Sequence, residues 1–286
     1  MPSETAPRMT WEGAVEWARR APEMADLIQI CYYDDPIEDA ARRFKASEEW
    51  QAIADLLPPG PNKSVIEIGA GRGIVSWAFA SEGCLVDAIE PDPSPIVGSG
   101  AIRQLNQVTG TSIGIVETFG ERLDFGDATF DYVICRAVLH HVKDLDQVAG
   151  EAHRVLKPGG RFLAIKEHVA ETPAELAAFL ASHPLHHLYG GEHAYPLGDY
   201  VRAFTKAGFL NVRKFGHYSH PVTSAPAITT DALRAQLSSA LGRKLPAAIA
   251  RWSAHRDTTL AIYRSWLTWR CRTPGRLYSF LAVKAP

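Results

Sequence analysis

Short runs of apolar and β-branched residues recur through the middle of the chain, separated by stretches of helical periodicity. Five of these runs predict buried parallel strands: SVIEI from Ser64, CLVDAI from Cys84, SIGIV from Ser112, FDYVICR from Phe130 and GRFLAIKEH from Gly160. The stretches between them, at residues 74–83, 94–108 and 145–156, predict helices. Strands that alternate with helices predict an α/β fold in which helices cover both faces of a parallel sheet.

Further elements are predicted on either side of this region. Residues 10–57 place apolar side chains at helical spacing, and the sequence PPGP ends them at Pro58. The later predicted elements are a helix over 197–207, a sixth strand over 209–218 and a last strand over 276–284. About fifty-five residues separate these last two strands, which is far longer than an ordinary connection.

The most specific stretch is VIEIGAGRGIVSWAFA, in which three glycines lie between a predicted strand and a predicted helix. Gly69, Gly71 and Gly73 permit a tight turn and let a ligand approach the backbone. Glu90 follows seventeen residues after Gly73, where a carboxylate can accept both hydroxyls of a ribose. A dinucleotide site needs a third glycine at position 74, which is Ile74, and an NTPase needs G-K-[ST]. The turn is therefore a poor pyrophosphate site, which argues against a nicotinamide dehydrogenase.

Four motifs in this order resemble those of class I S-adenosylmethionine-dependent methyltransferases. They are E-x-G-x-G-x-G at Glu67–Gly73, the acidic Glu90, GERLDFGDATFDYVICRAVLHHVKD from Gly120 and RVLKPGGRF from Arg154. The resemblance covers residues 64–166 and extends more weakly to Lys284. It implies S-adenosylmethionine as the cofactor and methyl transfer as the activity. It also implies a Rossmann-like, doubly wound, mostly parallel seven-stranded sheet whose last strand is antiparallel.

Carried over position by position, the resemblance places the cofactor contacts at Glu67, Gly69, Ala70, Gly71, Glu90, Pro91, Phe119, Gly120, Glu121, Arg136 and Ala137. Glu90 is expected to hold the ribose, and Glu67 to fix the glycine turn and the amino group. Many members of the family have an aspartate at the position of Phe119, so we expect Phe119 to pack on the adenine ring instead. Arg136 is expected beside the sulfonium end of the cofactor.

The acceptor side is less predictable, because methyl transfer mainly requires alignment of the acceptor and exclusion of water. His140 follows the fourth strand and is the first candidate for contact with the acceptor, with a structural role as an equal alternative. At the end of the fifth strand, alternation predicts that Glu167 points away from the face of its two neighbours. The predicted catalytic residues are His140, Glu192 and His193, and the predicted substrate contacts are Tyr33, Lys166, His168, Tyr189 and Tyr195.

The segment HPLHHLYGGEHAYP, residues 183–196, holds four of the eleven histidines. A capping box at Thr172 starts a helix that Pro184 ends. His183 and His187 therefore do not share the continuous helical face that i, i+4 zinc ligands need, and we expect no metal site. Because the segment leaves the fifth strand on the ligand side and contains a glycine pair, it is predicted to form a substrate-binding wall or lid. A polar surface loop without a ligand role is the alternative.

These predictions divide the chain into an N-terminal helical cover (1–61), a core (62–218 and 275–286) with a lid segment (168–196), and a helical insertion (219–274). Cover, lid and insertion are all expected on the substrate side, over the carboxyl-end face of the sheet, where they would enclose a pocket. We therefore expect methylation of a small-molecule acceptor at oxygen, in a biosynthetic pathway. The alternatives are a methyltransferase acting on nucleic acid or another anionic macromolecule, and a non-methylating enzyme that binds S-adenosylmethionine.

The distribution of charged residues adds information only for the helical insertion. The chain has 30 Lys and Arg against 32 Asp and Glu, but residues 219–274 hold eight basic and two acidic residues, so the insertion carries +6 and the rest −8. Solvated helix faces explain this most simply, and attraction to an anionic acceptor is the other explanation. The chain lacks an NPPY-type motif and an aromatic-basic strand pattern, which argues against nucleic acid as a partner.

The remaining composition predicts a cytoplasmic protein with no membrane partner. The four cysteines are widely spaced, the N-terminus lacks the apolar segment of a signal peptide, and no apolar run is long enough to span a bilayer. The sequence leaves homodimerisation open.

Overall fold

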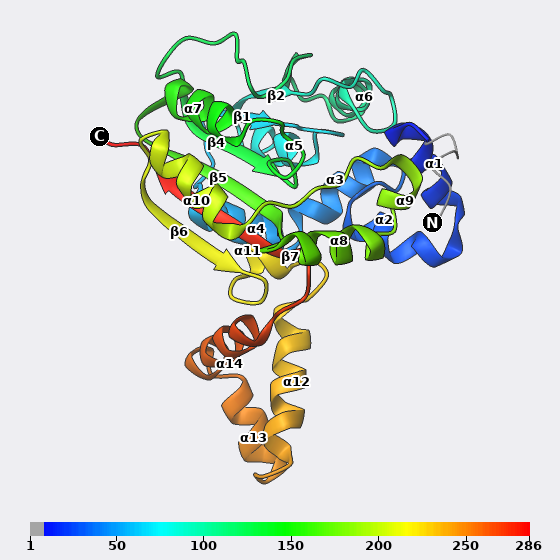
Figure 1. Cartoon of the computed structure of the whole chain (residues 1–286), viewed down its shortest axis with the longest axis vertical. Coiled ribbons are helices and arrows are strands. Elements are labelled where there is room, and N and C mark those ends of the chain that lie inside the picture. The colour runs from blue at the N-terminus through cyan, green and yellow to red at the C-terminus, as the bar shows by residue number, and fades with distance from the viewer. Residues whose placement is uncertain (1–8) are drawn as a thin grey trace.

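Seven strands form one mixed sheet in the computed structural model, which describes residues 9–286 (Figure 1). The strands are β1 (Ser64–Ile68), β2 (Leu85–Ile89), β3 (Gly114–Val116), β4 (Phe130–Arg136), β5 (Leu156–Val169), β6 (Leu210–Gly216) and β7 (Arg276–Val283). Their order is β3-β2-β1-β4-β5-β7-β6, and all neighbouring pairs are parallel except the two that β7 makes. The predicted Rossmann-like sheet is confirmed. Its strand order reverses between β1 and β4, which is where such sheets bind ligands.

Helices cover both faces of the sheet, because its central strands are apolar on both sides. On one face α4 (Glu48–Leu56), α5 (Ile74–Ala80) and α6 (Ser99–Thr109) contribute to a core cluster that contains Trp50 and Phe79. On the other face α7 (Leu145–Val155) and α10 (Leu197–Lys206) contribute to a second cluster around Tyr200. Across the described residues, no helix combines the length and apolar character needed to cross a membrane.

The N-terminal cover lies against the lid segment beside the sheet (Figure 1). Within the described residues the cover comprises α1 (Trp11–Arg20), η1 (Pro22–Met24), α2 (Ala25–Ile30), α3 (Ile37–Lys45) and α4; residues 1–8 lie outside them. The lid contains the predicted helix α8 (Pro173–Ser182) and a further short helix, α9 (His186–Tyr189), where a loop was expected. Leu185 packs with Met24 and Ile28 of the cover, so cover and lid share a small core.

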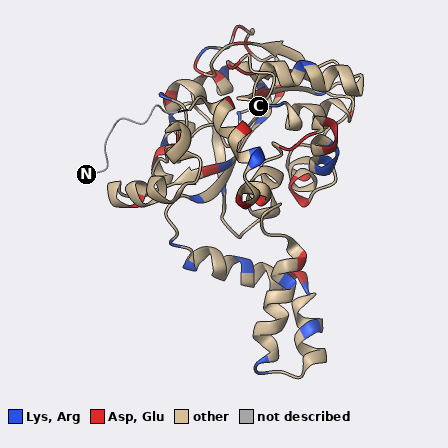
Figure 2. Ribbon diagram, turned by 90° about the vertical axis from the view of Figure 1, so that its right-hand side faces the viewer, with Lys and Arg blue, Asp and Glu red and all other residues tan. Residues whose placement is uncertain are grey.

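The helical insertion does not cover the carboxyl-end face, and this expectation was wrong. After α11 (Pro221–Ser224), which packs against α4, the chain forms α12 (Thr230–Gly242), α13 (Ala247–Ala254) and α14 (Asp257–Arg270). These three helices pack mainly on one another and project away from the sheet, as Figures 1 and 2 show. Their attachment to the rest of the chain includes hydrogen bonds from Thr230, at the start of α12, to Glu48 at the start of α4. Most of the basic residues on these helices lie away from the sheet (Figure 2), but Arg264 is buried and donates to the carbonyl of Tyr218.

Candidate functional site

The glycine turn after β1 adopts a conformation that side chains would disrupt. Gly69, Gly71 and Gly73 have φ angles of 67°, 53° and 74°. The backbone N–H groups of Gly69 and Ala70 donate to one carbonyl at the end of β2, at 2.8 and 3.0 Å, which fixes the turn against the neighbouring strand. A Cβ atom on Gly69 would lie 2.6 Å from a methyl carbon of Val138. The turn is thus both left-handed and tightly packed, and the predicted need for glycine is explained at this position.

Two buried carboxylates hold the turn from either side. Glu67 accepts hydrogen bonds from the backbone N–H and the hydroxyl of Ser76, at 2.8 and 2.5 Å, and so anchors the first turns of α5. Burial raises the pKa of Glu67 to about 8. Glu90 accepts the N–H of Gly71 at 2.7 Å and that of Asp92 at 2.9 Å, and burial raises its pKa too. Each oxygen of Glu90 accepts one hydrogen bond here, which leaves further lone pairs for a ligand.

A small cavity of about 70 Å³ lies between this turn and the N-terminal cover. Its lining residues are Cys31, Tyr32, Tyr33, Glu67, Gly69, Ala70, Gly71, Arg72, Ile74, Val75 and Arg136. Arg72 connects the glycine turn to the N-terminal cover. It donates to the carbonyl oxygens of Tyr32 and Asp34 at 2.9 and 2.8 Å and forms an ion pair with Asp35. The glycine turn and the cover therefore form one enclosure.

A buried ion triad forms the floor of the cavity. Arg136 at the end of β4 contacts Glu49 of α4, with 2.8 Å between Nε and Oε1. Lys166 of β5 contacts the other oxygen of Glu49 at 2.9 Å and also donates to the carbonyl of Ala225. Burial acts to raise the pKa of Glu49, but the attraction of Arg136 and Lys166 outweighs it and lowers that pKa. Arg136 thus lines the cavity as predicted, with its charge compensated, whereas Lys166, a predicted substrate contact, is engaged in this triad.

A second buried pair joins His140 to Glu167. The Nδ1 atom of His140 lies 2.7 Å from the carboxylate of Glu167, which also accepts the backbone N–H groups of Val138 and His140 at 3.2 and 3.0 Å. Burial raises the pKa of Glu167 to about 7 and lowers the pKa of His140 well below its usual value. Several N–H donors already meet the carboxylate, which favours its charged form and makes Nδ1–H of His140 a donor as well. The Nε2 atom of His140 then carries a free lone pair.

The prediction that Glu167 points opposite to both of its neighbours was wrong, because Glu167 and His168 lie on the same side. Strand alternation fails at this end of β5, where Lys166 has a φ of 61° and the pairing with β7 shifts register between Ala164 and Glu167. The irregularity turns Lys166 toward α4, while Glu167 and His168 both reach His140. Glu167 and Glu49 were therefore not among the site residues predicted from the sequence. For Glu167 a signal was available, because it directly precedes His168, a predicted site residue.

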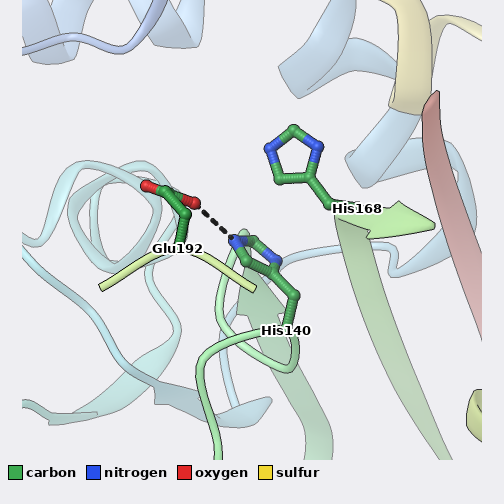
Figure 3. A group of neighbouring side chains, drawn as sticks. All are labelled: His140, His168 and Glu192. Carbon is green, nitrogen blue, oxygen red and sulfur yellow. Dashed lines mark ion pairs between the residues drawn. The ribbon is translucent and has the colours of Figure 1, made fainter. Parts of the chain in front are cut away.

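Beyond His140 lies a group of ligand-type side chains from three segments, shown in Figure 3 and called here the histidine–glutamate cluster: His140, His168 and Glu192. Their nitrogen and oxygen ligand atoms all lie within 4.8 Å of one another. The closest oxygen of Glu192 is 3.8 Å from Nε2 of His140, and the rings of His140 and His168 are 4.8 Å apart. Burial lowers the pKa of His168 to about 3, so this imidazole is neutral. The structure thus brings together three predicted residues.

An aromatic chain links the cavity to this cluster. Tyr33 lines the cavity and contacts the ring of Trp11, whose centroid lies 4.7 Å from that of Tyr189. The hydroxyl of Tyr189 donates to Glu192 at 2.5 Å. Two predicted residues, Tyr33 and Tyr189, therefore form a continuous wall between the glycine turn and Glu192.

Two predicted residues of the lid face elsewhere. The hydroxyl of Tyr195 donates to the carbonyl of Val142 at 2.7 Å, and the ring of His193 packs on Tyr195 with centroids 4.6 Å apart. These contacts fasten the lid to the loop after β4. Neither residue belongs to the cavity lining or to the cluster.

Six predicted cofactor contacts do not line the cavity: Glu90, described above, and Pro91, Phe119, Gly120, Glu121 and Ala137. Phe119 is 69% exposed, so the structure does not bring it to the cavity. A Cβ atom on Gly120 would collide with β1, and Glu121 accepts an N–H from the loop before α7. Ala137 has a φ of 55° and donates its N–H to a carbonyl of β5 at 2.8 Å. Pro91 is half-buried beside Glu90.

The residues of the cavity fit S-adenosylmethionine on physical grounds. The glycine turn exposes backbone where side chains would block approach, and Glu90 has unused acceptor positions for ribose hydroxyls. The cofactor's positive sulfur requires a wall without an unpaired cation. Arg136 meets this requirement through Glu49, and the ring of Tyr33, which lines the cavity, offers a π face that attracts cations.

Comparison with known proteins agrees with this geometry. A family model described as a methyltransferase domain matches residues 66–164. A ubiquinone biosynthesis O-methyltransferase of Pseudomonas syringae pv. tomato is 36% identical over 134 residues, which cover 43% of this chain and 56% of that protein. A thiol S-methyltransferase of Mus musculus is 33% identical over 131 residues, covering 44% and 51%. The matched segments thus span about half the length of these curated relatives.

A solved structure shows the same fold. The phosphoethanolamine N-methyltransferase 2 of Haemonchus contortus, in complex with S-adenosyl-L-methionine, superposes with a TM-score of 0.53 at 19% identity, covering 84% of this chain and 52% of that one. The ordered motifs, the strand order and the family match agree with one another. Residues 66–164 thus match a methyltransferase domain, and the sheet that contains them has the Rossmann-like fold of class I S-adenosylmethionine-dependent methyltransferases.

Proposed function

We propose that this protein transfers a methyl group from S-adenosylmethionine to the oxygen of a small-molecule acceptor. The observation that carries the proposal is the position of the buried histidine–glutamate cluster beside the glycine-turn cavity. Val138 packs against Gly69 in the turn, and two residues later His140 belongs to the cluster. A cofactor site and a polar acceptor site are thus separated by a single loop after β4.

The enclosure of this region supports a small acceptor. The cover and the lid meet over the carboxyl ends of the strands, and Arg72 holds the cover to the glycine turn. Nucleic acid would need an open, basic surface, but the excess of basic residues lies on α12–α14, which project away from the cavity (Figure 2). Because α12–α14 project away from the cavity, their basic residues also give less support to the expectation that they attract an anionic acceptor.

Transfer to oxygen is supported by the polar groups of the cluster. When bound, S-adenosylmethionine supplies a methyl group on a positively charged sulfur. An acceptor hydroxyl must lose its proton during transfer, and general acid–base groups or a metal ion can assist this loss. Glu167 orients His140 with its Nε2 lone pair free, and Glu192 adds a carboxylate within 3.8 Å. Of the two matched relatives, one is named as an O-methyltransferase of ubiquinone biosynthesis and the other as a thiol S-methyltransferase.

Cofactor binding provides the first test. Calorimetric titration with S-adenosylhomocysteine should show micromolar binding, and Glu90→Ala should weaken it at least about tenfold, because a charged hydrogen bond contributes roughly 1.5–3 kcal/mol. Glu117→Gln is the matched control, since Glu117 follows the next strand, is 42% exposed at its side chain and pairs with Arg103. Equal affinity of wild type and Glu90→Ala would refute the ribose assignment.

Methyl transfer itself is tested with S-adenosylmethionine carrying a labelled methyl group and a panel of hydroxylated, thiol and amine acceptors. Label in a hydroxylated product supports the proposal. Label only in thiol or amine products would refute transfer to oxygen. Tight cofactor binding with turnover of an acceptor but no methyl gain would favour the non-methylating alternative. The cytoplasmic location and the homodimer stay predictions.

A further inference from the structure

The histidine–glutamate cluster has the composition of a metal centre. Its members come from three segments that are distant in sequence: His140 follows β4, His168 ends β5 and Glu192 lies in the lid. We propose that these three side chains bind one divalent transition metal ion of the zinc type. Two imidazoles and one carboxylate form a donor set that leaves positions open for exogenous ligands. This replaces the expectation, drawn from spacing within the lid alone, that the chain has no metal site.

The distances require little movement to reach a coordination sphere. Tetrahedral zinc with bonds of about 2.0–2.1 Å places its ligand atoms about 3.4 Å apart. Nε2 of His140 and the nearest oxygen of Glu192 are 3.8 Å apart, and all three ligand atoms lie within 4.8 Å of one another. Glu192 follows two glycines, so a small shift of the lid brings its carboxylate closer.

Each imidazole is oriented from behind in the way that metal ligands are. The Nδ1 atom of His140 faces Glu167 at 2.7 Å, and the Nδ1 atom of His168 faces the carbonyl oxygen of Gly275, also at 2.7 Å. Both contacts select the tautomer in which Nδ1 carries the proton and Nε2 is a free ligand atom. A carboxylate or carbonyl behind a histidine also raises its basicity toward a metal.

The neighbouring His183 provides an independent indication. Its Nδ1 atom is buried, makes no hydrogen bond within the described part of the chain and lies 3.8 Å from Glu192. A buried ring nitrogen without a hydrogen bond is costly, and an ion between the two groups, or water bound to that ion, would satisfy it. Nitrogen-rich donors favour zinc-type ions over magnesium, which prefers oxygen ligands.

The use of such an ion rests on the proposed function, whereas its binding does not. An acceptor hydroxyl at an open coordination position would lose its proton more readily, because the ion stabilises the resulting oxygen anion. In that case the lone pair of His140 is occupied by the ion, and His140 acts as a ligand instead of a base.

Metal binding can be measured without any methyl acceptor. We would strip the full-length protein with a chelator and titrate it with Co²⁺, following the visible absorption bands that four- and five-coordinate cobalt produces. The expected result is saturation at one ion per chain, with full displacement by Zn²⁺. His168→Ala and Glu192→Gln should each weaken Co²⁺ binding at least about tenfold, and Glu167→Gln should do so by about 10–100-fold as an orienting partner.

The matched control is His187→Ala, in the same lid, where an exposed imidazole contacts only the carbonyl of Ala181 in the described hydrogen bonds. This variant should bind cobalt as wild type does. Because Glu192→Gln is isosteric, it keeps the proposal testable if His168→Ala fails to fold. Absence of the cobalt bands, or bands that persist unchanged in Glu192→Gln, would overturn the metal site. Cofactor binding measured on the same samples reports separately on the proposed function.

Discussion

Glu49 lies fully buried between two cations, and removal of its charge is the sharpest test of the cavity floor. Its carboxylate has no exposed surface and contacts Arg136 at 2.8 Å and Lys166 at 2.9 Å, whose side chains are 17% and 9% exposed. Glu49→Gln preserves the shape but leaves two buried positive charges without a counter-charge. Breaking a buried ion pair in this way costs about 3–5 kcal/mol. Gln retains one hydrogen-bond acceptor, so we expect a loss of about 3 kcal/mol and a Tm lower by about 6–12 °C.

Urea denaturation and thermal melts at pH 7 would measure this loss, with Asp55→Asn as the control on the exposed side of the same helix. The loss should be smaller at pH 9 than at pH 6, because burial lowers the pKa of Lys166 to about 8 and this side chain can shed its proton as the pH rises. The variant should also bind cationic S-adenosylmethionine less well relative to neutral S-adenosylhomocysteine, since Arg136 would no longer be compensated. A loss below about 1 kcal/mol, equal to that of Asp55→Asn, would refute this reasoning.

Three further predictions concern the turn and the lid. Gly69→Ala should destabilise the protein by about 2–4 kcal/mol in chemical denaturation, because of its φ of 67° and the 2.6 Å approach to Val138; Gly150→Ala, which meets open space in α7, should not. Wild type should lose stability relative to Glu67→Gln as the pH rises from about 5 to 8. The pKa of Glu67 is about 8 in the folded protein, so folding favours the protonated carboxyl and this stabilisation is lost as the pH approaches 8. The difference in free energy of unfolding between wild type and Glu67→Gln should change by about 4–5 kcal/mol in total, and a difference independent of pH would contradict the prediction. Tyr195→Phe should cost about 1 kcal/mol of stability and leave the acceptor KM unchanged, whereas a large rise in KM would restore its predicted role as a substrate contact.

The strands and the glycine turn were predictable because their signals are local. SVIEI and FDYVICR are continuous apolar runs, and a strand buried on both faces needs no more than that. The three glycines occur where left-handed φ angles are needed, and the hydrogen bonds of Glu90 to the turn agree with its predicted place at the site. Residues whose role depends on the local backbone, such as the three glycines, could therefore be identified from the order and spacing of the motifs.

Residues whose role depends on partners distant in the sequence could not be identified from the order and spacing of motifs. Glu49 lies 87 residues before Arg136 in the sequence and gains its role only when α4 packs under the sheet. Glu167 was predicted to point opposite to both Lys166 and His168, because alternation assumes a regular strand and Lys166 breaks the regularity. The helices α12–α14 were placed over the pocket for a similar reason: helical periodicity predicts that they form but not the direction in which they leave the sheet.

Arg72, which lies between the second and third glycines of the turn, has a consequence for the rate of cofactor exchange. Its guanidinium donates hydrogen bonds to the carbonyls of Tyr32 and Asp34, and Arg72 is also one of the residues that line the cavity. A molecule as large as S-adenosylmethionine passes between these walls only after the cover moves away from the turn, and that movement breaks several charge-assisted hydrogen bonds at once. We therefore expect the contacts of Arg72 with the cover to slow dissociation of the cofactor.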